Sequence, residues 1–180
     1  NAGNSIESGG NYNVVVGDEA GTAITTGDAN TFVGYASGDA TTTGSENTAV
    51  GQSTLTENTT GVENTAVGLI ALNKNTTGGK NTALGRGALY NNTTASNNTA
   101  VGYNSLVANT TGDGQAFGAY ALFSNTTGSN NTALGATALY ANTTGVNNLA
   151  AGLASLRYNT TGGSNVALGV NALNANTTAS

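Results

Sequence analysis

The chain of 180 residues contains no cysteine, histidine, proline, methionine or tryptophan. Without cysteine it forms no disulfide bonds, thiolate nucleophiles or thiolate metal sites, and without histidine it lacks the commonest metal ligand and general base. Charged residues make up only 7% of the chain, against roughly 25% in an ordinary globular domain. We therefore expect a protein that is not an enzyme and that binds neither a cofactor nor a metal ion.

Long hydrophobic runs and basic clusters are also missing. No apolar run reaches the roughly 20 residues of a membrane-spanning helix. No basic and apolar leader opens the chain, so we expect any export signal to lie outside this sequence. The net charge is −5, with only four lysine and arginine residues, whereas a nucleic-acid partner requires clustered positive charge. We expect no membrane insertion and no nucleic-acid partner.

Glycine, asparagine and threonine are abundant, and they recur with a fixed period. The unit reads N-T-A-(V/L)-G-x-x-A-L-x-x-N-T-T-G-x-x, and its first glycine, the marker glycine, returns every 17 residues except for one step of 16. The marker glycines are Gly17, Gly34, Gly51, Gly68, Gly85, Gly102, Gly118, Gly135, Gly152 and Gly169. Such a unit is too short for a helix pair, and its glycines interrupt any single helix. It favours a coil of two short strands joined by two turns.

We therefore predict an all-β fold, a parallel β-solenoid of about ten 17-residue coils, over residues 13–180, preceded by an N-terminal segment, residues 1–12. Stacked coils are ~4.8 Å apart, so equivalent residues form columns. Asparagine columns can exchange side-chain amide hydrogen bonds, and stacked like charges would repel, which accounts for the low charge. The first two coils have Gly21 and Gly38 where later coils have leucine, which indicates a capping end or an end interface.

Alternation in N-T-A-V-G places threonine and valine on one side of a strand and alanine on the other. We predict that the valine or leucine before the marker glycine fills the interior together with the leucine four residues after it. These core residues are Val50, Val67, Leu84, Val101, Leu134, Leu168, Leu72, Leu89, Leu106, Leu122, Leu139, Leu156 and Leu173. The alanine column would then form an uncharged outer stripe. Because one thin coil buries little apolar surface, we expect the chain to associate with itself.

Units such as NTAVGYNSLVANTTG, around residues 99–112, and NTALGATALYANTTG, residues 131–145, resemble the repeats of phage tail-fibre and "tail fiber domain-containing" proteins. They are more distantly similar to the head repeats of trimeric autotransporter adhesins, although a repeat of 17 is longer than the adhesin-head unit. The resemblance covers roughly residues 13–180. It implies a parallel β-roll, commonly a homotrimer, that serves as a stalk or adhesive head outside the cell, on a cell-surface appendage or on a virion.

The N-T-T triplet is also an N-glycosylation sequon. Candidate sites are Asn58, Asn75, Asn92, Asn109, Asn125, Asn142, Asn159 and Asn176. The alternative, which we favour, is that these side chains hydrogen-bond to the backbone of the turn and to each other. Regular threonine columns also resemble ice-binding surfaces, but the paired threonines precede a turn glycine and are expected at a corner.

Tyrosines occupy variable positions of the repeat. An exposed tyrosine on a rigid rod could stack on a cell-surface glycan, or it could simply cover the edge of the coil. The candidate residues for surface binding are Tyr90, Tyr103, Tyr120, Tyr140 and Tyr158.

Charge is distributed unevenly along the chain. Residues 1–63 hold eight of the nine acidic residues, and residues 64–180 hold all four basic ones. We interpret the acids as a solvated face; calcium binding by Asp18, Glu19, Asp28 and Asp39 is weaker, since the calcium-roll nonapeptide is missing. The sequence thus favours a structural fibre module. The alternatives are a filament subunit that stacks head to tail through complementary ends, and a glycan- or ice-binding surface.

Overall fold

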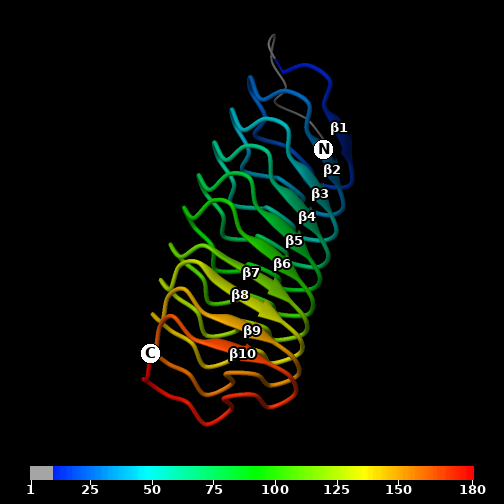
Figure 1. Cartoon of the computed structure of the whole chain (residues 1–180). Coiled ribbons are helices and arrows are strands. Elements are labelled where there is room, and N and C mark those ends of the chain that lie inside the picture. Colours follow the sequence, from blue (N-terminus) through cyan, green and yellow to red (C-terminus); the bar gives the residue numbers. More distant parts are fainter. Residues whose placement is uncertain (1–9) are drawn as a thin grey trace.

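The computed structural model describes residues 10–180, so the first nine residues of the predicted N-terminal segment lie outside the described part. Ten short parallel strands form one sheet whose spatial order follows the sequence. The strands are β1 (Val14–Val16), β2 (Thr31–Val33), β3 (Thr48–Val50), β4 (Thr65–Val67), β5 (Thr82–Leu84), β6 (Thr99–Val101), β7 (Gly114–Phe117), β8 (Asn131–Leu134), β9 (Leu149–Ala151) and β10 (Val166–Leu168). They line one side of a rod of stacked coils (Figure 1). The predicted β-solenoid is confirmed, although each described coil contains one strand rather than two.

Every strand pairs in register with the next. Ala66 pairs with Ala49 on one side and with Ala83 on the other, so each position of the repeat becomes a column along the rod. The 16-residue step keeps this register, because Gly114 pairs with Asn131. The residue that this coil lacks therefore lies in the corner before the strand, where other coils place a residue with positive φ, such as Asn130 with φ 57°.

The interior consists of two apolar columns and a third, mixed column of buried alanine, serine and threonine three residues after the marker glycine. The middle residue of each strand points inward, and Ala49 and Ala66 are 0% exposed. It packs against the leucine four residues after the marker glycine, which confirms that part of the predicted core. The fully buried leucines are Leu55, Leu72, Leu89, Leu106, Leu122, Leu139 and Leu156. The predicted outer stripe of alanine is wrong, because these methyl groups line the core.

The residue before the marker glycine points outward, so this part of the predicted core is also wrong. Val50 and Val67 are 37% exposed and Leu134 is 41% exposed. The column also contains the partly exposed Leu84 and Val101 and the exposed Leu168. The side chains alternate as predicted, but in the opposite sense: the narrow coil has room for alanine opposite the leucine column and not for a second large side chain. Leu173, in the last coil, is 50% exposed because no further coil covers it.

One buried hydroxyl in the second coil has no partner. Thr41 is 0% exposed, and its Oγ1 makes no hydrogen bond. Replacing Thr41 by the isosteric valine is expected to raise the free energy of unfolding by about 1 kcal/mol, because a buried polar group without a partner destabilises the fold. Urea unfolding monitored by circular dichroism measures the difference.

Thr54 provides the matched control for this substitution. It is equally buried, but its Oγ1 donates to the Gly51 carbonyl oxygen at 2.9 Å and lies 2.9 Å from the Ser37 hydroxyl. The change Thr54→Val should therefore lower the free energy of unfolding by about 1 kcal/mol. Equal effects of the two substitutions would contradict the assignment of Thr41 as an unpaired hydroxyl.

Candidate interaction surfaces

Two asparagine columns run through the rod as hydrogen-bonded ladders. The first is formed by the asparagine that precedes each strand: Asn64 Nδ2 donates to Asn47 Oδ1 at 3.1 Å and to the Gly78 carbonyl oxygen at 2.9 Å. The second is formed by the N-T-T asparagine: Asn75 Nδ2 donates to Asn58 Oδ1 and to Gly78 O, both at 2.9 Å. The expected ladder is confirmed. The sequence interpretation does not single out the first column, although its recurrence directly before the threonine-alanine pair of five strands is a signal for it.

These ladders are incompatible with N-glycosylation of the folded coils. Of the eight candidate asparagines, seven are 0% exposed: Asn58, Asn75, Asn92, Asn109, Asn125, Asn142 and Asn159. Their Nδ2 atoms, to which a glycan would be attached, are engaged in hydrogen bonds inside the rod. Asn176, in the last coil, is partly exposed, but its Nδ2 also donates to Asn159 Oδ1 at 3.0 Å. The favoured alternative, that these side chains hydrogen-bond within the turn and to each other, is confirmed, and their burial does not favour glycosylation of the folded coils.

The first ladder is interrupted at the 16-residue coil. Gly114 stands in the asparagine column, and its backbone nitrogen donates to Asn98 Oδ1 at 2.8 Å. Asp113 Oδ1 accepts a hydrogen bond from the Asn130 backbone nitrogen at 2.8 Å. A shallow pocket of about 250 Å³ opens here, lined by Asp113, Gly114, Gln115, Asn130, Asn131 and Thr132. With a single carboxylate and no further ionisable group, its lining offers little for catalysis.

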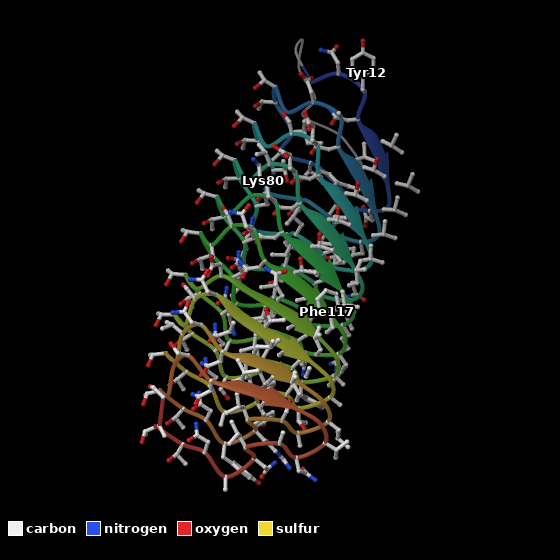
Figure 2. The ribbon with its side chains drawn as sticks, in the orientation of Figure 1. Tyr12, Lys80 and Phe117 are labelled. Atoms are coloured by element: carbon white, nitrogen blue, oxygen red, sulfur yellow. The ribbon has the colours of Figure 1, made fainter. Side chains whose placement is uncertain are left out.

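The outward side of the ten strands, here called the sheet face, is uncharged from end to end. Its first column is Val14, Thr31, Thr48, Thr65, Thr82, Thr99, Gln115, Thr132, Leu149 and Val166, and its second is Val16, Val33, Val50, Val67, Leu84, Val101, Phe117, Leu134, Ala151 and Leu168. Phe117 is 41% exposed, and Figure 2 shows it on the side of the rod where the strands run. Every described coil thus presents at least one outward apolar side chain here.

Four aromatic residues, Tyr103, Tyr120, Phe123 and Tyr140, form a strip on another side of the coils. Tyr103 and Tyr120 meet edge to face with ring centroids 5.1 Å apart, and Phe123 stacks on Tyr140 at 5.1 Å. Burial, together with the neighbouring Tyr103 hydroxyl, raises the pKa of Tyr120, because both disfavour the phenolate. The strip covers the turn side of the coils and packs largely against itself.

Cations occupy several of the remaining ring faces. Arg86 lies 5.5 Å from the ring centroid of Tyr103, and its Nη1 donates to that hydroxyl at 2.9 Å. Arg157 lies 5.8 Å from the Tyr140 ring centroid and 5.3 Å from that of Tyr158, and Lys74 lies 5.1 Å from that of Tyr90. Neighbouring rings and cations therefore already cover part of the ring surface on which a sugar would stack. The aromatic glycan site stays a prediction, and this packing does not favour it.

The acidic residues of the first coils are bound to their own chain rather than gathered around a site. Asp28 Oδ1 accepts a hydrogen bond from the Asn11 backbone nitrogen at 2.7 Å, and Asp39 accepts one from Thr22. The Tyr35 hydroxyl hydrogen-bonds to Glu19, and this bond and the negative charge raise the pKa of Tyr35. Within residues 10–180, no three potential metal-ligating side chains come together, so the geometry does not support the calcium alternative.

Comparisons with known proteins place the chain in no family. It matches no protein-family model, no curated protein and no solved structure. The likeness to tail-fibre and adhesin repeats therefore stays a prediction from the repeat unit. Over residues 10–180, no helix has the length and hydrophobicity that a membrane span requires.

Proposed function

We propose that this protein is a structural fibre module, a rigid non-catalytic rod that packs side by side with copies of itself, as a homotrimer, through the sheet face. One observation carries the proposal: an uncharged surface, with apolar side chains on every coil, extends along all ten strands. A monomeric protein rarely exposes a continuous apolar surface of more than a few hundred Å². This face runs the length of the rod, on the order of 48 Å at ~4.8 Å per strand.

A second copy of the chain is the partner that fits this surface best. Its side chains repeat with the pitch of the coils, so an identical rod presents the same pitch and can interdigitate along its whole length. Because neither face carries charge, no desolvated charge remains between the copies. Association also buries valine and leucine side chains that the thin interior, filled by alanine and leucine, cannot accommodate.

The rest of the coil supports a mechanical role. Two asparagine ladders and the strand hydrogen bonds tie each coil to its neighbours, so bending the rod would strain bonds on several sides at once. The fibre setting implied by the repeats, outside the cell or on a virion, is consistent with a chain that needs no catalytic group.

The state of association in solution tests the proposal. The chain is expected to elute and scatter light as a discrete trimer, with three times its mass of 17.6 kDa, over a wide range of concentrations. The double variant Val67→Glu/Leu134→Glu places like charges inside the proposed contact and should be monomeric with an unchanged circular dichroism spectrum. The matched control Thr77→Glu/Thr144→Glu adds the same charge to the same coils away from the sheet face, and should remain trimeric.

Two results would reject the lateral packing. One is a monomeric native chain at all concentrations, and the other is a sheet-face variant that still forms the trimer. Rods that lengthen with protein concentration would instead support the head-to-tail filament.

A further inference from the structure

In every coil the second threonine of the N-T-T triplet, which reads I-T-T in the first coil and T-T-T in the second, lies exposed at a corner. These residues, here called the threonine ridge, are Thr26, Thr43, Thr60, Thr77, Thr94, Thr111, Thr127, Thr144, Thr161 and Thr178. Each stands nine residues after a marker glycine, about half a coil away from the strand. The ridge continues unbroken through the 16-residue coil, and a row of oxygen-tipped side chains follows the edge of the rod opposite the strands in Figure 2.

The other strongly repeated columns have roles inside the rod. The first threonine of the triplet is an example: Thr59 Oγ1 donates to the Thr76 carbonyl oxygen at 3.1 Å, and Thr76 Oγ1 to that of Thr93 at 3.0 Å. Asparagines form the ladders and the inner leucines fill the core. By contrast, no ridge hydroxyl makes a hydrogen bond within residues 10–180.

Exposed columns of this protein otherwise vary freely. The column directly after the marker glycine, for example, begins Asp18, Tyr35, Gln52, Leu69 and Arg86. The ridge is therefore the one exposed column whose residue never changes among the ten coils, although nothing inside the chain requires its hydroxyl. A constant exposed hydroxyl with no internal partner indicates a use outside the chain.

We propose that the ridge threonines are sites of O-linked glycosylation. In this reaction Thr Oγ1 attacks the anomeric carbon of a nucleotide-activated sugar in the active site of a glycosyltransferase. The new bond joins Oγ1 to the anomeric carbon, the bond from that carbon to the phosphate oxygen breaks, and the nucleoside diphosphate leaves. The hydroxyl proton passes to a base of that enzyme.

The geometry favours this chemistry over other uses of the row. A corner offers one hydroxyl at a time to an enzyme cleft, and the glycine that follows it, such as Gly78, adds no side chain there. An ice surface requires a flat array rather than a corner. Phosphorylation would place charges of about −2 on coils only ~4.8 Å apart, where they repel strongly; neutral sugars carry no such penalty.

Glycans on the ridge would leave the sheet face free, so this inference does not depend on self-association. The test is peptide mass spectrometry, with electron-transfer fragmentation, of the protein isolated from its natural source. Sugars are expected on the second threonine of a triplet and not on the first: on Thr77 but not Thr76, and on Thr127 but not Thr126. Unmodified ridge threonines, or equal modification of both threonines of a pair, would overturn the proposal.

Variants produced in the natural host sharpen this result. The change Thr60→Val/Thr77→Val/Thr94→Val is expected to remove the glycans of three coils without altering the circular dichroism spectrum. The control Thr59→Val/Thr76→Val/Thr93→Val removes inner hydroxyls, so the glycans should remain while stability falls. Loss of glycans from the control, with its fold intact, would show that the ridge is not the acceptor.

Discussion

Replacing Gly85 by alanine is expected to lower the free energy of unfolding by about 4 kcal/mol. Gly85 adopts φ 132°, and a Cβ atom there would lie 2.6 Å from the carbonyl oxygen of Gly102 in the next coil. That coil cannot retreat easily, because the Gly102 nitrogen donates to the Leu84 carbonyl oxygen at 2.8 Å. Backbone strain of about 1–3 kcal/mol and overpacking of about 1–3 kcal/mol therefore act together.

Gly169 separates these two contributions. It has a similar φ of 114°, but a Cβ atom there would meet nothing within 4 Å. Gly169→Ala should therefore lower the free energy of unfolding only by the backbone strain. Gly169 lies in the terminal coil, so this loss is local to that end of the rod. Stacked coils unfold in local units. The stability of the coils that flank each substitution should therefore be measured by hydrogen exchange in addition to urea unfolding. If Gly85→Ala and Gly169→Ala lower the free energy of unfolding equally, the close approach of neighbouring coils at Gly85 does not contribute to the effect.

Truncating Phe32 to alanine is expected to destabilise the chain by about 3–5 kcal/mol, and adding Gly38→Leu should restore most of that loss. Phe32 stands in the inner strand column where later coils have alanine, and it is 0% exposed. A Cβ atom on Gly38 would lie 2.5 Å from its ring. The pair thus fills with one large side chain the space that Ala49 and Leu55 fill in the next coil.

Gly38→Leu alone should be destabilising, because its side chain would collide with the Phe32 ring. The backbone itself accepts leucine: Gly38 has φ 60°, and Leu55 and Leu72 occupy the same position at 51° and 48°. A double-mutant cycle measures the coupling, which we expect to exceed about 3 kcal/mol. Additive effects of the two substitutions would contradict the interpretation that the Phe32 ring fills the space that a leucine at position 38 would occupy.

The sequence was sufficient to predict what depends on periodicity. A period of 17 residues implies stacked coils, columns and side-chain ladders whatever the path of the backbone. The direction in which a strand faces depends instead on the space inside the coil. Alternation alone could not decide between Ala66 and Val67, because both are apolar.

The candidate surfaces were harder to predict for a related reason. The sequon at Asn75 says nothing about the burial of its Nδ2 atom, and the tyrosines gave no sign that Phe123 and Tyr140 stack on each other. The sequence did reveal the constancy of the ridge threonines. Only the structure separates them from inner threonines such as Thr76, whose hydroxyls hold neighbouring coils together.

The 16-residue coil makes one position along the rod different from all the others. Two strictly periodic rods can slide past one another by one coil and regain nearly the same contacts, so their alignment is degenerate. At the 16-residue step the sheet face changes, with Gln115 in place of threonine and the bulkier Phe117 in place of valine or leucine. Sliding by one coil would bring Phe117 against the wrong neighbours, such as Val101. In the proposed lateral packing, the single irregular coil would therefore favour one alignment of the rods over the others.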